Sequence, residues 1–175
     1  MARLPYADPH RPEVEAITEK IVAQRGNVLH LYQMLLHSGP LAEGWLRFLT
    51  AVRQELSLSA SLRELAIIRV AVLNGAQYEA DQHKPFALKS GLTQAQLDAL
   101  ARWQDSTLFE PVQRAALALT DAMTRDIRVP DEVFAEVKKH LGDQEVVELV
   151  ATIAAYNMVS RFLEAMQIHS SDERK

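Results

Sequence analysis

Residues 63–93 read RELAIIRVAVLNGAQYEADQHKPFALKSGLT, and this stretch decides the fold class that the sequence predicts. Its first half is apolar on nearly every side of a helix, which indicates a central, buried helix. Asn74-Gly75 supplies a C-terminal stop signal for that helix. A second helix is expected over 77–89, and Gly91 follows its end. The stretch therefore predicts two consecutive helices joined by a short connection.

Helical periodicity also dominates the rest of the chain, and β-branched runs with a period of two are lacking. We therefore predict an all-α fold of about eight or nine helices. A single domain is expected over 1–175, with an N-terminal arm (1–11) and a frayed tail (169–175). The other expected helices cover approximately 12–24, 28–37, 41–52, 94–103, 111–124, 130–140 and 144–167.

The composition excludes several classes of protein. A formal net charge of −4, without a run of Lys or Arg, gives no electrostatic footprint for nucleic acid or an anionic membrane surface. No apolar run approaches the ~18 residues of a membrane span, and the N-terminus lacks the pattern of a signal peptide. The chain contains no cysteine, which removes disulfides, thiolate metal sites and thiol redox chemistry. We expect a cytoplasmic enzyme or binding protein.

Three ionisable side chains make the 63–93 stretch a candidate site. Glu79 and His83 lie one turn apart on the second expected helix, so the carboxylate can orient the imidazole. Glu64 lies on the apolar first helix, where burial of a carboxylate requires a partner such as His83. A buried Glu beside a His is a usual general acid/base arrangement. This interpretation requires Glu64 and His83 to lie within direct or one-water hydrogen-bond reach of one another in a cleft.

Other interpretations of the same residues stay open on spacing alone. Glu79 and His83 could be a solvated surface pair, and Glu64 could simply complement the helix macrodipole. A metal hydrolase that uses Glu64, Glu79 and His83 as ligands is a further alternative. One His with two carboxylates is a thin ligand set for zinc, so we expect no metal.

The 63–93 stretch resembles the core motif of the carboxymuconolactone decarboxylase family, which also contains the alkylhydroperoxidase-D-like proteins. The segments LPYADP (4–9), EPVQRAALALTD (110–121) and AAYNMVSRF (154–162) agree with the resemblance, so it spans most of the chain. It implies an alkylhydroperoxidase-D-like helical bundle.

In the hydroperoxidase branch of that family, a Glu is followed by Cys-x-x-Cys and then by a His. Matched position by position, the Glu is Glu64 and the His is His83, whereas Ala76 and Glu79 stand at the two cysteine positions. Hydroperoxide reduction in those relatives needs both thiols. The resemblance therefore points to the cysteine-free, decarboxylase-like branch, and we do not expect thiol peroxidase activity.

The resemblance implies a cofactor-free lyase that acts on a carboxylated lactone or related metabolite of aromatic catabolism. His83 would donate the proton, Glu64 would orient or relay it, and Tyr78 would donate a hydrogen bond to the oxyanion. Glu79 is a candidate substrate contact whose role the sequence leaves open. Asn157 and Arg161 could bind a substrate carboxylate, although such an Arg more often ties helices together.

A non-redox ligand-binding or inactive paralogue is the main alternative to this lyase. In either case the expected partner is a small molecule, with no cofactor, nucleic acid or membrane. Relatives of this kind assemble as trimers or hexamers, so the resemblance also implies a closed, symmetric homo-oligomer.

Overall fold

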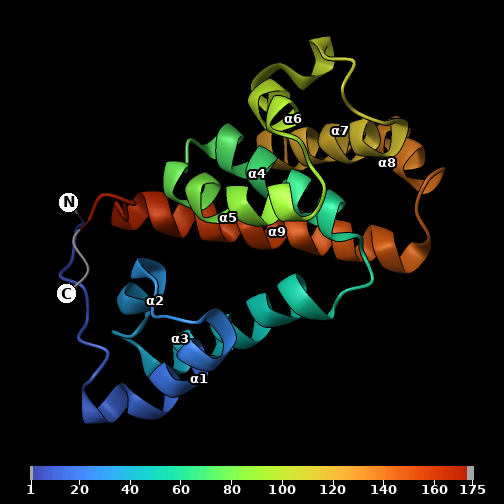
Figure 1. The fold of residues 1–175 in the computed structure, drawn as a ribbon. Coiled ribbons are helices and arrows are strands. Elements are labelled where there is room, and N and C mark those ends of the chain that lie inside the picture. The colour runs from blue at the N-terminus through green and yellow to red at the C-terminus, as the bar shows by residue number, and fades with distance from the viewer. Residues whose placement is uncertain (1, 173–175) are drawn as a thin grey trace. The chain divides into compact units, whose positions relative to one another are not determined.

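The structure is a computed structural model in which residues 2–172 are described (Figure 1). The described residues form nine α-helices and no strand, which confirms the predicted all-α class. The helices are α1 (Glu15–Arg25), α2 (His30–Leu35), α3 (Gly39–Thr50), α4 (Ala60–Asn74), α5 (Gln77–Lys89), α6 (Gln94–Ala99), α7 (Pro111–Arg125), α8 (Asp131–Lys138) and α9 (Asp143–Met166). Short 3₁₀ or π-helical turns cover Pro12–Val14, Ala51–Glu55 and Leu100–Asp105.

The chain divides into two compact units. The first comprises Met1–Glu55 and Leu163–Lys175, of which 2–55 and 163–172 are described, and the second comprises Leu56–Phe162. The expected single domain stays a prediction. Of the tail for which fraying was expected, residues 173–175 lie outside the described residues.

The N-terminal arm of the first unit is held by hydrogen bonds. Ala7 N–H donates to Gln33 O of α2 at 3.2 Å, and Tyr6 Oη donates to Asp172 Oδ2 at 2.6 Å. The bond from Tyr6 outweighs partial burial and holds the pKa of Asp172 below its usual range. Residues 169–172 are therefore tied to the arm within this unit.

Helix α4 is the centre of the second unit, as its apolar sequence predicts. Ser59 Oγ accepts from Leu62 N–H at 3.3 Å and caps the start of α4. Gly75 ends it with φ 68°, a left-handed conformation that favours glycine. The buried core that joins α4 to its neighbours contains Leu65, Ile68, Ala87, Leu92, Leu100, Trp103, Phe109 and Leu117.

Helix α9 runs beside α5 (Figure 1), and side chains of the two helices are in contact. Among the described helices, α9 alone is long and apolar enough to cross a membrane. Its most apolar window is 61% buried inside the protein. Burial of this extent is typical of the core helix of a soluble protein.

A buried ion pair joins α4 to α7 in the second unit. Arg69 is 1% exposed, and its guanidinium binds the Asp121 carboxylate through two bonds, Nε to Oδ1 at 2.6 Å and Nη2 to Oδ2 at 2.8 Å. Trp103 Nε1 also donates to Asp121, at 3.2 Å. Two-fold bonding of this kind fixes the relative orientation of the two helices.

Glu148 of α9 caps the segment that leads into α4. Its carboxylate accepts from Leu58 N–H at 2.7 Å, Ser57 Oγ at 2.9 Å and Gln144 Nε2 at 2.9 Å. Burial opposes ionisation of this group, but the hydrogen bonds from Gln144, Leu58 and Ser57 together outweigh it and hold the pKa of Glu148 below its usual range.

Replacing Glu148 with alanine should lower the free energy of unfolding at neutral pH by about 2–3 kcal/mol, because a buried N–H donor loses a charged acceptor. Since the folded-state pKa is lowered, this stabilisation is complete above ~4.3, the unfolded value for Glu, and is lost as the pH falls through the folded value. Chemical unfolding of both proteins at neutral and acid pH measures the difference. Glu145→Gln, at a half-buried residue of the same helix that accepts one bond from Gly142 N–H, is the matched control. Equal stability of Glu148→Ala and wild type at neutral pH would contradict the proposed cap.

Candidate functional site

Helices α4 and α5 bring Glu64 and His83 into direct contact. His83 Nδ1 lies 2.7 Å from Glu64 Oε2, and both side chains are buried (5% and 4% exposed). The contact expected from the sequence is therefore confirmed. The two residues are 19 apart in sequence, and the tight turn at Gly75 folds α5 back along α4 so that they meet.

The imidazole of His83 is packed between aromatic rings. The ring of Tyr156 on α9 meets it edge-on, with centroids 4.9 Å apart, and that of Phe86 lies at 6.2 Å on α5. On the far side of the pair, Arg63 Nε lies 3.6 Å from Glu64 Oε1. The ring of His83 is thus fixed in direction by Glu64 and in position by Tyr156.

Glu79 is bound to α9. Its side chain is 2% exposed, and Ser160 Oγ lies within hydrogen-bond distance of Glu79 Oε2. The solvated surface pair that spacing alone allowed for Glu79 and His83 is therefore wrong, because both residues are buried. Tyr78 is also buried, at 5% exposed, but it is turned by about 100° from Glu79 around the helix.

Asn157 ties three helices together. Its Nδ2 donates to Thr124 Oγ1 at 2.9 Å and to Ile153 O at 3.0 Å, and its Oδ1 accepts from Asn74 at 3.1 Å and Arg161 at 2.7 Å. These four bonds match the two donors and two lone pairs of an amide side chain. Its contacts favour a structural role. Arg161 is exposed on α9, and its Nη1 donates to Asn157 O at 3.1 Å and to Asn157 Oδ1 at 2.7 Å. Its expected contact with a substrate carboxylate stays a prediction.

Sequence reasoning missed Tyr156 and Ser160, which face the site from α9. The sequence predicts Asn157 and Arg161, one turn apart, as substrate contacts. Tyr156 and Ser160 have the same spacing, and it is these two side chains that contact α5. The pattern that predicts this contact is a Tyr and a Ser one turn apart, which share one face of an otherwise apolar helix.

No three His, Asp or Glu side chains in the described part of the chain are arranged to hold a metal ion. Glu79 is engaged by Ser160 on α9, whereas Glu64 and His83 are engaged with one another. The geometry gives the metal-hydrolase alternative no support.

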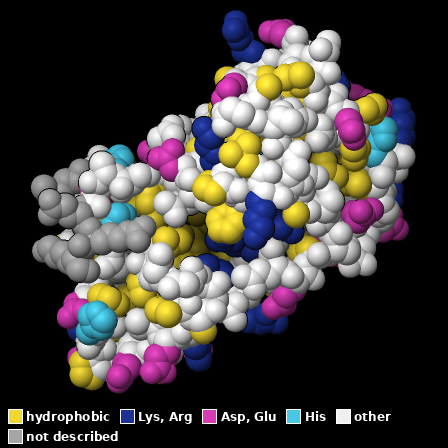
Figure 2. All heavy atoms as spheres, in the orientation of Figure 1, with side chains coloured by type: hydrophobic (Ala, Val, Ile, Leu, Met, Phe, Trp, Pro, Cys, Tyr) yellow, Lys and Arg dark blue, Asp and Glu magenta, His cyan; other side chains and the backbone are white. Residues whose placement is uncertain are grey.

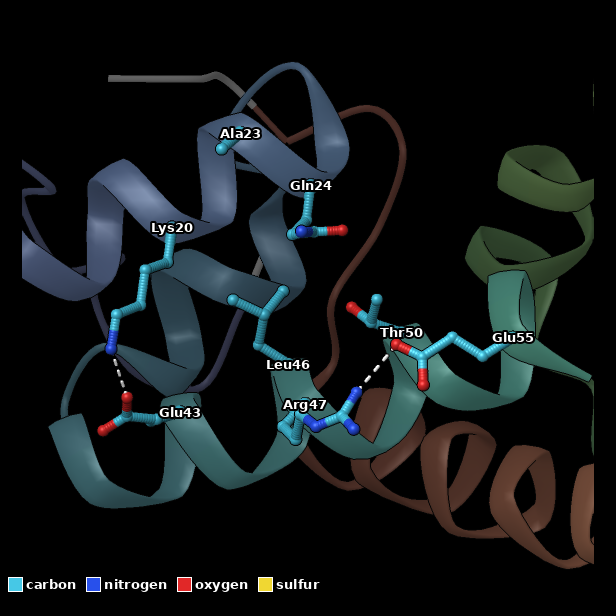
Figure 3. A pocket seen from close by; sticks show the side chains of 8 residues that line it. All are labelled: Lys20, Ala23, Gln24, Glu43, Leu46, Arg47, Thr50 and Glu55. Carbon is cyan, nitrogen blue, oxygen red and sulfur yellow. Dashed lines mark hydrogen bonds and ion pairs between the residues drawn. The ribbon is translucent and has the colours of Figure 1, made fainter.

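A groove of about 330 Å³ lies elsewhere, in the first unit between α1 and α3 (Figure 3). Ion pairs between exposed side chains flank it, Lys20 with Glu43 and Arg47 with Glu55. Leu46 and Ala23 also line it. None of the expected site residues lines this groove. It is therefore distinct from the cluster formed by Glu64, Glu79, His83 and Tyr156.

Comparison with known proteins places the chain in a family. The model of the carboxymuconolactone decarboxylase family matches residues 39–122. The uncharacterized protein YdfG of Bacillus subtilis is 34% identical over 112 residues, which are 63% of this chain and 76% of that protein. The uncharacterized protein YnjA of Escherichia coli is 28% identical over 126 residues, 71% of this chain and 66% of that protein.

Solved structures share the fold at low sequence identity. An uncharacterized peroxidase-related protein from Ralstonia eutropha, described as an alkylhydroperoxidase AhpD core, superposes with a TM-score of 0.83 at 16% identity, over 98% of this chain and 93% of its own. The debrominase Bmp8 in complex with 2,3,4-tribromopyrrole gives 0.79 at 18% identity, over 97% and 95%. These likenesses establish the fold alone.

Proposed function

The chain belongs to the carboxymuconolactone decarboxylase family, and from this premise we propose that it is a cofactor-free, decarboxylase-type lyase acting on a carboxylated lactone or a related metabolite. The observation that carries the proposal is the buried contact of 2.7 Å between His83 Nδ1 and Glu64 Oε2. A His held in place by a carboxylate is a usual general acid/base arrangement.

The proposed reaction needs a proton donor and a group that accepts an electron pair. The bond between the substrate carboxylate and its carbon breaks, carbon dioxide leaves, and the electron pair moves into the conjugated carbonyl to give an oxyanion. His83 then donates a proton to carbon. Because Glu64 holds Nδ1, the proton is delivered from Nε2, and the carboxylate stabilises the imidazolium before transfer.

Other residues of the cluster assist this step in the proposal. The Tyr78 hydroxyl donates to the oxyanion, and Arg161 binds the anionic substrate through its exposed guanidinium. Glu79 contacts the substrate from the turn of α5 before His83. Asn157 supports this arrangement indirectly, because it orients Arg161 with a bond of 2.7 Å.

Thiol peroxidase chemistry does not belong to the proposal. The chain has no cysteine, and Ala76 (1% exposed) and Glu79 (2% exposed) stand at the positions of the family's redox pair. One structural neighbour is a debrominase and another is peroxidase-related. A fold with such different activities does not select the reaction, so the proposal depends on the site.

A ligand-binding paralogue is the second candidate. The observation that favours it is the 5% exposure of His83, since a ring this enclosed must be reached by substrate before it can transfer a proton. Retention of the buried Glu64–His83 pair, whose burial has a desolvation cost, favours the lyase.

In the proposal, the protein acts in the cytoplasm as a closed homo-oligomer, either a trimer or a hexamer. Figure 2 shows hydrophobic side chains at the surface on the face that it presents. In the second unit, the large apolar side chains exposed in the single chain include Val72, Phe86, Val147 and Met158. Contact between protomers would remove such groups from water.

Turnover of a panel of carboxylated lactones and aromatic-catabolism intermediates tests the function. The expected result is release of carbon dioxide and loss of the conjugated lactone absorbance for at least one compound, with no added metal or cofactor. Binding of a compound without turnover, unchanged in Glu64→Gln, would replace the lyase with the ligand-binding paralogue.

A further inference from the structure

The outer face of α9 carries no charged side chain over about three helical turns. Four residues with a 4-3-4 spacing lie on this face, and we define them as the outer strip: Val147, Ala151, Ala154 and Met158. Val147 is 68% exposed and Met158 is 39% exposed, whereas Ala154 is exposed and Ala151 is half-buried. Residues with this spacing share one side of a helix. The solvent side of a surface helix usually carries charged and polar residues instead.

Helix α9 is therefore apolar on two opposite sides. The side opposite the outer strip is buried and includes Val146, Leu149 and Ile153. Only 61% of the most apolar window of α9 is buried inside the protein. A helix that is apolar all round is typically covered all round. The outer strip therefore indicates a contact with a surface outside this chain.

The side chains of the outer strip have the same order of size in both directions. A larger side chain lies at each end, Val147 and Met158, and two alanines lie between them. Two copies of α9 that cross antiparallel at the alanines place Val147 against Met158 of the partner subunit. They also place Ala151 against Ala154 of the partner subunit, so the two helices can approach closely. Each residue then contacts its counterpart twice, as a two-fold axis requires.

Polar residues beyond the ends of the outer strip favour the antiparallel direction. Antiparallel pairing places Arg161, which lies one turn beyond the strip, beside Gln144 of the partner subunit. Gln144 lies in the first turn of α9, which contains Asp143 and Glu145. Since Asp143 is paired with Lys138, the carboxylate of Glu145 gives this end a net negative charge. Parallel pairing would instead place the two Arg161 guanidinium groups side by side, where like charges repel.

Arg161 has further donors for this contact. Both of its hydrogen bonds to Asn157 come from Nη1, so Nε and Nη2 remain for contacts beyond the described part of the chain. The amide of Gln144 uses Nε2 to donate to Glu148 Oε1 at 2.9 Å, and its Oε1 can accept from a guanidinium. Arg161 can therefore bind Gln144 of the partner subunit as well as the substrate of the proposed function.

We propose that the outer strip of α9 is a contact between two copies of this chain, which cross antiparallel about a two-fold axis between Ala151 and Ala154. This contact goes beyond the proposed reaction, and it gives the proposed homo-oligomer a specific interface. A two-fold contact occurs in a dimer and in a hexamer built from three such pairs, but not in a cyclic trimer. The proposal therefore requires an even number of subunits.

Light scattering and sedimentation of the whole protein measure this number. The wild type should have an even multiple of the chain mass of 19.7 kDa. Ala154→Glu places a carboxylate in each half of the contact, so it should halve this mass and raise the dissociation constant by roughly 100-fold or more. Ala135→Glu, at an exposed alanine of α8, is the matched control and should keep the wild-type mass. A wild-type mass of one or three chains, or an unchanged mass in Ala154→Glu, overturns the proposal.

Disulfide formation tests the direction in which the two helices cross. The chain contains no cysteine, so an introduced cysteine gives an unambiguous cross-link. Residue 151 lies near the axis, and Ala151→Cys should form an inter-chain disulfide under mild oxidation. Val147→Cys should not, because antiparallel pairing separates the two copies of residue 147 by about 16 Å along the helices. A cross-link in Val147→Cys and none in Ala151→Cys would contradict the antiparallel contact.

A lipid bilayer is the other surface that an exposed apolar helix face can meet. Flotation with phosphatidylcholine vesicles distinguishes the two. We expect the wild type to stay in the aqueous fraction, and a monomer that floats with the vesicles overturns the proposal. None of these measurements needs turnover of a lactone. If the mass and the cross-link are as expected and no lactone turns over, the contact stands and the lyase function fails.

Discussion

Replacing His83 with alanine is expected to lower the turnover number for the carboxylated lactone by about 100-fold to 10,000-fold, the usual contribution of general acid/base catalysis. The ring is the proton donor of the proposed reaction, and it is in direct contact with the carboxylate of Glu64. Binding of the lactone should change much less than turnover, because the substituted group acts on the reacting carbon. Steady-state kinetics with folding monitored by circular dichroism provides the measurement.

A surface His–Glu pair supplies the matched control. His140 Nε2 lies 3.5 Å from Glu136 Oε1, with side chains 27% and 48% exposed, so His140→Ala removes an imidazole beside a carboxylate without touching the buried cluster. It should retain wild-type turnover. Glu64→Gln should lose less activity than His83→Ala and move the pH profile, because it changes how His83 holds its proton. Equal turnover in His83→Ala and His140→Ala would remove His83 from the mechanism.

Local signals allowed most of the helices to be predicted from the sequence. The helix expected over 77–89 is observed as Gln77–Lys89, and the stop at Gly75 is observed as expected. These features depend on neighbouring residues alone. The helix expected over 12–24 differs at its start, where Pro12–Val14 is a 3₁₀ turn and Val14 leaves helical geometry with φ −118° and ψ 2°.

The candidate site could be predicted only where its partners are near in sequence. Glu64 and His83 are 19 residues apart on consecutive helices, so a short turn brings them together once both helices are recognised. Ser160 and Glu79 are 81 residues apart, and their contact depends on where α9 packs. No local sequence pattern predicts how α9 packs, so the contact between Glu79 and Ser160 could not be predicted from the sequence.

The ion pair between Arg69 and Asp121 was missed for the same reason. The two residues are 52 apart, and an Arg in an apolar helix reveals no partner. The pair is nevertheless buried and joined by two hydrogen bonds. Arg69 Nη1 also donates to Leu100 O at 2.7 Å, so the guanidinium fixes α4, α7 and the turn after α6 together.

Removing one partner of that pair should therefore have the largest effect on stability of the substitutions considered. Asp121→Leu leaves the guanidinium of Arg69 buried without a counter-charge, and loss of one partner of a buried pair costs about 3–5 kcal/mol. A change of this size lowers the thermal midpoint by roughly 10 °C in a chain of this length. Arg69→Met should also destabilise, but by less, because Asp121 keeps hydrogen bonds from Trp103 and Gln104 and lies beside the exposed Arg125. Thermal and chemical unfolding of both variants measure the loss.

Two comparisons separate the buried pair from a general effect on α7. Arg125 Nη1 lies 3.6 Å from the same Asp121 carboxylate, but its side chain is 56% exposed, so Arg125→Ala should cost no more than about 1 kcal/mol. The double variant Arg69→Met/Asp121→Leu leaves no uncompensated charge and should be more stable than the sum of the single losses implies. If the single losses simply add, the two side chains act independently and the coupling between α4 and α7 lies in their apolar contacts. A positive coupling, together with an Arg125→Ala variant as stable as the wild type, would show that burial makes this ion pair strong. An exposed Arg beside the same carboxylate contributes little.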